Sequence, residues 1–214
     1  MPAPAIKICG ISTAQALGAA LKAQADYVGF VFYPPSPRHL TLGEAAKLSA
    51  QAAGHSLRVG LFVDADDALL GDAVAAAQLD VLQLHGAESP ARVAELKARF
   101  GLPVWKALPI AARADVLRAD AYTGTADLIL FDAKTPKGTL PGGMGLAFDW
   151  NLVAGWKGHC AWGLAGGLSA ENIAEAVRLT AAPLVDTSSG VESAPGVKDA
   201  VKIAAFCKAA RLNS

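Results

Sequence analysis

The sequence predicts an α/β fold, a single-domain (β/α)8 TIM barrel that spans residues 1–214. Short apolar segments alternate with longer Ala-rich segments, as they do where helices connect the strands of a parallel sheet. We find eight segments of each kind, and successive right-handed β–α units close naturally into a ring. Neither a linker nor a low-complexity stretch divides the chain, and 214 residues suffice for one well-packed domain.

The expected strands share runs of apolar residues, which strands buried on both faces require. They are residues 5–9, 27–32, 58–63, 80–84, 103–107, 127–131, 159–164 and 183–187. A doubly wound open sheet is the structural alternative, but it would leave edge strands, which tend to be shorter or more polar. We see no obvious edge strand in this set and therefore favour the closed barrel.

Helices are expected in the Ala-rich segments between the strands. They are residues 13–24, 42–53, 66–78, 89–100, 112–120, 149–155, 170–181 and 197–211. Asp66, Ser89 and Ser169 are plausible N-caps, because a short side-chain oxygen can accept from the free N–H groups of a first helical turn.

Alternation along the strands separates an apolar face from a face with polar residues. On the first strand, Ile6 and Ile8 share one side, and Lys7 and Cys9 share the other. The apolar side suits packing against helices, and the other suits the barrel interior and its mouth. The same reasoning on the fourth, sixth and eighth strands gives the set expected at the mouth: Lys7, Cys9, Gln83, His85, Asp132 and Asp186.

Cys9 is the first candidate for a chemical role. A lone cysteine is usually a small core residue, but Cys9 ends a strand and shares a face with Lys7. A nearby ammonium lowers the pKa of a thiol and favours the thiolate, which can act as a base or a nucleophile. His85 could partner a nucleophile, but the sequence offers no third group to orient it, so we favour proton transfer. Cys160 and Cys207 are better interpreted as packing residues.

Asp132 follows the most apolar stretch of the sixth strand and precedes a long loop rich in Gly, Pro, Lys and Thr. A carboxylate at the C-terminal end of a parallel strand faces the mouth of the sheet, where ligands bind. Loops of this length are usually functional. The alternative interpretation is a surface Asp before a flexible linker.

Two Gly- and Ser-rich loops, residues 165–169 and 186–192, follow the last two strands. Barrels of this class bind phosphate at these loops through backbone N–H groups. Another loop, residues 32–39, contains three prolines that hold Arg38 forward. An Arg that faces the mouth would bind a carboxylate bidentately, and the alternative is a solvated Arg on a rigid turn.

The composition excludes several classes of function. The net charge is +0, with 19 basic and 19 acidic residues, so we expect neither a nucleic-acid nor a membrane partner. The three cysteines match no zinc spacing and no disulfide framework. We interpret His39 and His85 as hydrogen-bonded polar groups, and expect no metal and no organic cofactor. Since we find no signal layout and no membrane-spanning run, we expect a cytoplasmic protein.

Motifs along nearly the whole chain together resemble one family. They are residues 7–12, 29–38, 82–86, 131–134, 138–143, 148–150, 164–168, 188–192 and 195–198. This combination resembles the phosphoribosylanthranilate isomerase family of tryptophan biosynthesis. Departures are small: Ser12 stands where Thr is common, and Thr187 stands where Val is common.

The resemblance implies an Amadori rearrangement, from N-(5'-phosphoribosyl)anthranilate to 1-(2-carboxyphenylamino)-1-deoxyribulose 5-phosphate. It implies that Cys9 is the general base, Asp132 the general acid and Arg38 a ligand of the anthranilate carboxylate. Asp132 must be protonated and Cys9 ionised when they act, so we expect the pKa of Cys9 to be lowered towards neutrality.

The resemblance also implies further substrate-binding residues: Gly166, Gly167, Ser189 and Gly190 for the phosphate, and Asp186 at the mouth. The expected partner is a phosphorylated small molecule, and the chain is expected to be a monomer or a homodimer.

Two other functions stay open on the residues alone. A different phosphosugar isomerase on the same barrel would usually use two carboxylates, and Cys9 argues against it. A non-catalytic phosphate-binding module would explain the Gly-rich loops, but not a Cys and an Asp directed at one mouth.

Overall fold

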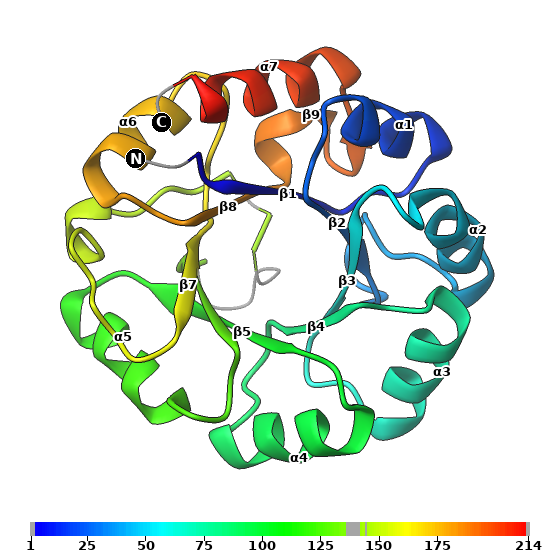
Figure 1. Cartoon of the computed structure of the whole chain (residues 1–214), viewed down its shortest axis with the longest axis horizontal. Coiled ribbons are helices and arrows are strands. Elements are labelled where there is room, and N and C mark those ends of the chain that lie inside the picture. Colours follow the sequence, from blue (N-terminus) through cyan, green and yellow to red (C-terminus); the bar gives the residue numbers. More distant parts are fainter. Residues whose placement is uncertain (1–2, 136–141, 144, 213–214) are drawn as a thin grey trace.

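The computed structural model of the chain describes residues 3–135, 142–143 and 145–212. Within these residues, eight parallel strands form a closed barrel in the order β1-β2-β3-β4-β5-β6-β7-β8, and helices surround it (Figure 1). The predicted (β/α)8 barrel is confirmed, and the open-sheet alternative is wrong, because β8 pairs with β1.

The strands lie within three residues of their predicted ends. They are β1 (Ala5–Cys9), β2 (Tyr27–Val31), β3 (Leu57–Phe62), β4 (Val81–Leu84), β5 (Val104–Ile110), β6 (Leu128–Ala133), β7 (Ala161–Leu164) and β8 (Leu184–Thr187). In the register of the sheet, Lys7 lies opposite Asp186 of β8, and Cys9 lies opposite Gly29 of β2.

The α-helices cover the outer face of the barrel. They are α1 (Ala14–Lys22), α2 (Leu42–Ala52), α3 (Asp67–Ala77), α4 (Pro90–Phe100), α5 (Arg113–Leu117), α6 (Ile173–Thr180) and α7 (Ala200–Arg211). The Asp66 and Ser89 caps are confirmed, because their side chains accept from the N–H groups of Leu69 and Arg92.

Three predicted helices differ from the structure. The helix predicted over 112–120 is the short α5 followed by the 3-10 helix η1 (Arg118–Tyr122), and the one over 149–155 is a single 3-10 turn, η2 (Trp150–Leu152). The helix over 170–181 begins only at α6, because the Asn172 side chain accepts from the Ser169 N–H group. Ser169 therefore lies outside the helix, and its prediction as N-cap is wrong.

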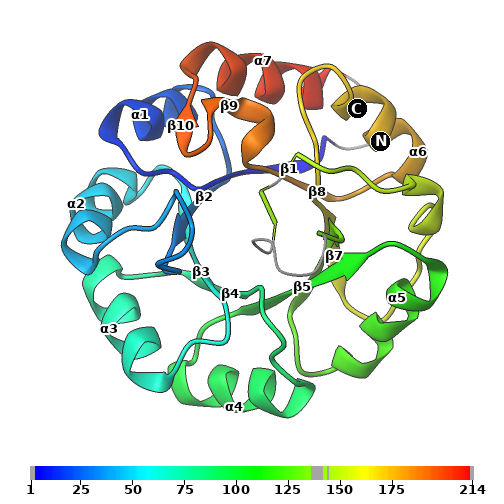
Figure 2. The same ribbon diagram turned by 180° about the vertical axis from the view of Figure 1, so that it is seen from behind.

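The start of the last helix was also wrong. The 3-10 helix η3 (Ser189–Val191) leads into two short antiparallel strands, β9 (Glu192–Ala194) and β10 (Val197–Lys198). This pair lies by the rim between α1 and α7 in both views (Figures 1 and 2). Gly196 provides the turn at a φ of +81°, and α7 begins only after Asp199, which caps it.

The predicted division of strand faces is confirmed. Ile6 and Ile8 belong to the apolar layer between barrel and helices. A separate cluster fills the barrel interior: Val59, Val81, Trp105, Ala107, Leu128, Leu130, Ala165 and Leu184. Cys9, Val31 and Leu61 form a third cluster. The interior is therefore a packed core, and the polar side chains gather at its C-terminal end.

Three aspartates brace the N-terminal edge of the barrel by the same contact. Asp26, Asp80 and Asp127 each stand directly before an even-numbered strand. Their carboxylates accept from backbone N–H groups of the preceding strands β1, β3 and β5, at 2.7, 2.8 and 2.8 Å. Each carboxylate thus links two neighbouring strands at the N-terminal end of the barrel.

Replacing Asp26 by Ala should lower the free energy of unfolding by about 1–3 kcal/mol, because the buried Ile6 N–H group loses its acceptor. Asp26→Asn keeps an acceptor oxygen and should lose less. Denaturant unfolding checks this, with Asp72→Asn on the exposed surface of α3 as control. Equal stability of Asp26→Ala and the wild-type chain would contradict the bracing role.

Candidate active site

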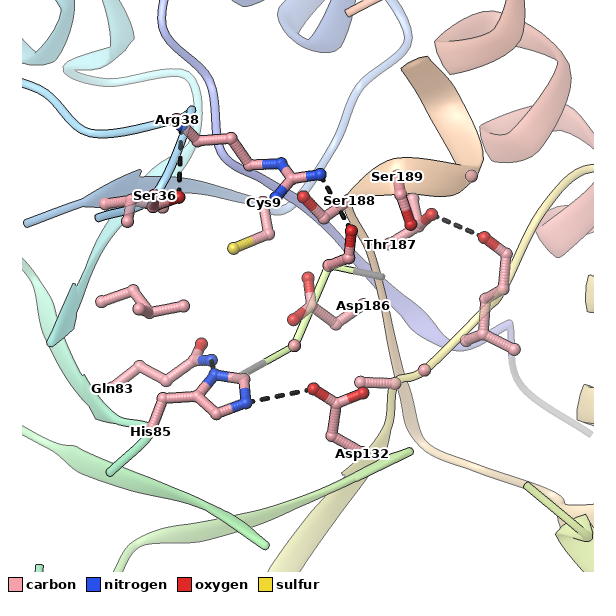
Figure 3. Close-up of a pocket in the computed structure, with 18 of the residues that line it drawn as sticks. Cys9, Ser36, Arg38, Gln83, His85, Asp132, Asp186, Thr187, Ser188 and Ser189 are labelled. Carbon is pink, nitrogen blue, oxygen red and sulfur yellow. Dashed lines mark hydrogen bonds and ion pairs between the residues drawn. The ribbon is translucent and has the colours of Figure 1, made fainter. Parts of the chain in front are cut away.

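A cavity opens at the C-terminal ends of the strands. Residues from loops and strands far apart in sequence line it (Figure 3). All the site residues expected from the sequence are among them: Cys9, Arg38, Asp132, Gly166, Gly167, Asp186, Ser189 and Gly190. Gln83 and His85 also line the cavity, as expected. Lys7 does not: it is fully buried, so its predicted place at the mouth was wrong.

Cys9 and Lys7 share a space that Gly29 leaves open. A Cβ atom on Gly29 would lie 3.0 Å from the Cys9 Sγ atom and 3.3 Å from the Lys7 Cε atom. Any side chain at position 29 would therefore push both groups away from the wall of the barrel. Lys7 has no exposed surface, and its ammonium pairs with the Asp186 carboxylate at 3.0 Å.

The ionisation of these groups differs from the expectation for Cys9. Burial raises the pKa of the Cys9 thiol, and the opposing effect of the Lys7 ammonium is smaller. The expected net lowering is therefore wrong, although Lys7 does act in that direction. Burial alone would lower the pKa of Lys7, but Asp186 and Cys9 outweigh it, so the pKa of Lys7 is raised and the ammonium stays protonated.

Asp132 contacts His85, for which no partner was identified from the sequence. Its Oδ2 atom lies 3.1 Å from the His85 Nε2 atom, and its Oδ1 atom accepts from the Ala133 N–H group at 2.8 Å (Figure 3). On the other side of the ring, Gln83 Nε2 lies 3.4 Å from His85 Nδ1. His85 is thus a hydrogen-bonded polar group, as expected, and it fixes the position of the Asp132 carboxylate.

Gly166 makes room for the same carboxylate. Its φ is +83°, and a Cβ atom there would lie 2.9 Å from Asp132 Oδ1 and 2.5 Å from the Ala133 backbone nitrogen. A substituent at position 166 would therefore be strained and would displace Asp132. Gly166 therefore leaves room for the Asp132 carboxylate, in addition to its predicted role in the phosphate-binding loop.

Arg38 is buried, so the alternative of a solvated surface Arg is wrong. Its Nε and Nη2 atoms donate to the Glu192 carboxylate at 2.7 and 2.8 Å, and Nη2 also donates to the Gly143 carbonyl at 3.0 Å. Glu192 additionally accepts from the Lys198 ammonium at 2.6 Å. One edge of the guanidinium is therefore occupied by protein, whereas Nη1 makes none of these contacts with the described residues.

Glu192 and Lys198 are site-building residues that our sequence reasoning missed. Burial acts to raise the pKa of Glu192, but Arg38 and Lys198 outweigh it, so the pKa is lowered and Glu192 is an anion. Lys198 also donates to the Ser188 carbonyl and hydroxyl oxygens at 3.0 and 3.1 Å. Both residues stood in motifs that carried the family resemblance, which was the available signal.

The two Gly-rich loops meet at the cavity. Gly167 has a φ of +64°, and a Cβ atom there would lie 2.8 Å from the Leu146 carbonyl carbon. A Cβ atom on Gly190 would lie 1.9 Å from the Leu168 carbonyl oxygen. Glycine is therefore required for these backbones to approach each other, and Ser189 lies beside them on η3.

The loop after β6 also reaches the cavity through its described part. A Cβ atom on Gly142 would lie 2.9 Å from His85 Cε1 and 3.0 Å from Asp132 Oδ2. Most of the motif at residues 138–143 lies outside the described residues.

A buried pair beneath the cavity was likewise not foreseen. Lys106 of β5 and Glu88 lie 3.0 Å apart, and Glu88 also accepts from the Gly86 N–H group at 2.9 Å. The pair therefore braces the loop that follows His85. Nothing in the strand pattern indicated it, because Lys106 stands among apolar residues.

Among the described residues, no group of three or more His, Cys, Asp or Glu side chains could hold a metal ion. The helices described for this chain include none that is long and apolar enough to cross a membrane.

Comparison with known proteins gives concordant results. The family model for N-(5'-phosphoribosyl)anthranilate (PRA) isomerase matches residues 6–209. The N-(5'-phosphoribosyl)anthranilate isomerase of Paracoccus denitrificans is 58% identical over 205 residues, which is 95% of each chain.

Solved structures agree. Monomers generated from the dimeric phosphoribosylanthranilate isomerase of Thermotoga maritima superpose with a TM-score of 0.84 at 35% identity, over 97% of this chain and 98% of the other. A phosphoribosylanthranilate isomerase in complex with reduced 1-(o-carboxyphenylamino)-1-deoxyribulose 5-phosphate gives a TM-score of 0.85 at 33% identity, with the same coverage. On its matched length and identities, this chain belongs to the N-(5'-phosphoribosyl)anthranilate isomerase family.

Proposed function

We propose that the cavity carries out the family's reaction with Cys9 as general base and Asp132 as general acid. The chain is an isomerase of tryptophan biosynthesis that converts N-(5'-phosphoribosyl)anthranilate to 1-(2-carboxyphenylamino)-1-deoxyribulose 5-phosphate. The observation that carries the proposal is that a thiol and a carboxyl group, from β1 and β6, line one cavity.

The reaction needs one acid and one base. Asp132 gives its proton to the ring oxygen of the ribose, the bond from that oxygen to C1′ breaks, and the anthranilate nitrogen forms an iminium with C1′. The Cys9 thiolate then removes the proton from C2′. The electron pair of that C–H bond forms the C1′–C2′ double bond of an enolamine, and the electron pair of the C=N double bond returns to nitrogen. Tautomerisation protonates C1′ and leaves a ketone at C2′.

The strand order supports this sequence of steps. β1 and β6 are separated by β7 and β8 around the ring, which is consistent with a sugar held between base and acid. Asp186 Oδ1 is buried and has no hydrogen-bond partner among the described residues. It lies between the two strands and is available to accept from a sugar hydroxyl, which supports the substrate-binding role proposed for Asp186.

Charge complementarity supports the placement of the two anionic ends of the substrate. Arg38 and Lys198 with Glu192 leave one positive charge in excess at one side of the cavity. We assign the anthranilate carboxylate to Arg38. We assign the phosphate to the N–H groups of the loops that carry Gly166, Gly167, Ser189 and Gly190, where barrels of this class bind phosphate.

The remaining expectations complete the proposal. The enzyme needs no metal or organic cofactor, since each step above is a proton transfer. It works in the cytoplasm as a monomer or a homodimer, and its partner is the phosphorylated substrate rather than nucleic acid. Size-exclusion chromatography with light scattering separates the two oligomeric states.

Removing either proton-transfer group should abolish most of the turnover. Cys9→Ser and Asp132→Asn should each lower kcat by about 10²–10⁴-fold, the usual contribution of a general acid or base. KM should change much less, because neither group is assigned to ground-state binding. Substrate made in place from anthranilate, phosphoribosyl pyrophosphate and a transferase allows turnover to be followed by fluorescence.

Cys160→Ser is the matched control, since Cys160 lies away from the cavity, and it should keep full kcat. If purified Cys9→Ser also keeps near-full kcat, Cys9 is not the base.

Arg38→Ala should chiefly raise KM, by about 10–100-fold, because a charge-assisted contact contributes about 1.5–3 kcal/mol. Arg58→Ala is the control: Arg58 is also ion-paired, with Asp80, but stands at the N-terminal edge of β3. Steady-state kinetics of both variants test the assignment, and an unchanged KM in Arg38→Ala would remove the proposed carboxylate contact.

Inorganic phosphate should compete with substrate, and a crystal grown with it should show the anion against Gly166, Gly167, Ser189 and Gly190. The backbone N–H groups that would hold it carry no titratable charge, so the competition should follow the ionisation of phosphate itself. Density for the anion only at another place, at saturating concentration, would contradict the phosphate assignment.

A further inference from the structure

Lys7 is a buried charged residue that the reaction above does not use. It lies two residues before Cys9 on β1, has no exposed surface, and pairs with Asp186 Oδ2 at 3.0 Å. A buried ammonium is costly unless it is paired, and a pair of this kind is weak grounds for stability alone. Its position beside the proposed base therefore calls for a functional reason.

The end of the Lys7 side chain lies near the thiol. A Cβ atom at Gly29 would lie 3.0 Å from Cys9 Sγ and 3.3 Å from Lys7 Cε, so both atoms border the same small space. Asp186 lies opposite Lys7 in the strand register and holds the ammonium there. Its second oxygen has no partner among the described residues, so substrate can engage Asp186 without releasing Lys7.

We propose that Lys7 is a positioning residue of the reaction: its ammonium, held by Asp186, stabilises the thiolate form of Cys9 from within the barrel. The inference rests on the proposed role of Cys9 as general base. A thiol surrounded by apolar residues resists ionisation, and an adjacent cation offsets part of that cost. Asp186 acts on Cys9 in the opposite direction, because a thiolate and a carboxylate repel each other.

Other charged groups also face Cys9, and Lys7 has the largest effect of them. Lys198 of β10 acts in the same direction as Lys7, and Arg38 lies over Gly10 at the end of β1. Asp132 and His85 line the same cavity from β6 and from the loop after β4. β2 presents Gly29 and Val31 to Cys9, which carry no charge.

Lys7 and Asp186 act on the ionisation of Cys9 in opposite directions, so replacing each should shift the pH profile of the thiol in opposite directions. Alkylation of Cys9 by iodoacetamide, without substrate, is followed across pH by mass spectrometry of the peptide that carries it. Lys7→Met should move the midpoint of the rate profile to higher pH by about 1–3 units, and Asp186→Asn should move it to lower pH. At a given pH below the midpoint, each unit means tenfold less or more thiolate.

The acid limb of kcat/KM in Lys7→Met should move in the same direction as the thiol profile. A merely structural role for Lys7 would change alkylation at every pH through accessibility, without moving the midpoint upward. An unmoved midpoint in folded Lys7→Met would overturn the proposal.

If Lys7→Met fails to fold because Asp186 is left unpaired, the comparison passes to Lys7→Met/Asp186→Asn against Asp186→Asn. The double variant should again titrate at higher pH than the single one, and equal midpoints would overturn the proposal. A different result would show that Cys9 is not the general base: Cys9→Ser would then keep full kcat, whatever the pH profile of the thiol.

Discussion

The ion pair between Lys7 and Asp186 joins the first strand of the barrel to the last, where the ring closes. Both residues are buried and stand opposite each other in the register. Removing one partner of such a pair typically costs about 3–5 kcal/mol, because the other charge is left buried and alone. Lys7 also lies on β1, the strand of the proposed base Cys9, and its ammonium is the charge next to Cys9 on that strand. This ion pair therefore lies both where the ring closes and beside the proposed base Cys9.

The other polar groups of the mouth follow the same rule, since each is paired with a residue from another part of the chain. Asp132 is held by His85, and Arg38 by Glu192. Gly166 leaves room for Asp132, and Gly29 leaves room for Lys7 and Cys9, because a Cβ atom at either position would crowd these side chains. The wall of the cavity is therefore built from paired polar side chains and from glycines that leave room for them.

The sequence allowed the barrel and its strand faces to be predicted, because periodicity two and apolar runs are local properties. The weaker helices were misjudged for a local reason as well: Asn172 and Asp199 set the starts of α6 and α7 by side-chain contacts that compete with a longer helix. Site residues at strand ends were predictable, because all parallel strands end at the same mouth.

The partners of those residues were not predictable from local pattern. Arg38 and Glu192 are separated by 154 positions, and their contact depends on how the β9–β10 pair folds back over the rim. The direction of the Cys9 pKa was misjudged for a related reason. Sequence indicated the nearby ammonium, but only the packed structure shows how completely the thiol is buried.

In the proposed reaction, Cys9 and Asp132 flank the reacting carbons of the sugar. A crystal structure of this chain with reduced 1-(o-carboxyphenylamino)-1-deoxyribulose 5-phosphate tests it most directly. The account predicts Cys9 Sγ within about 3.5 Å of C2′, the distance of a reactive arrangement, and Asp132 on the other side of the sugar chain. A bound ligand whose C2′ faces away from Cys9, with Asp132 contacting only solvent, would contradict it.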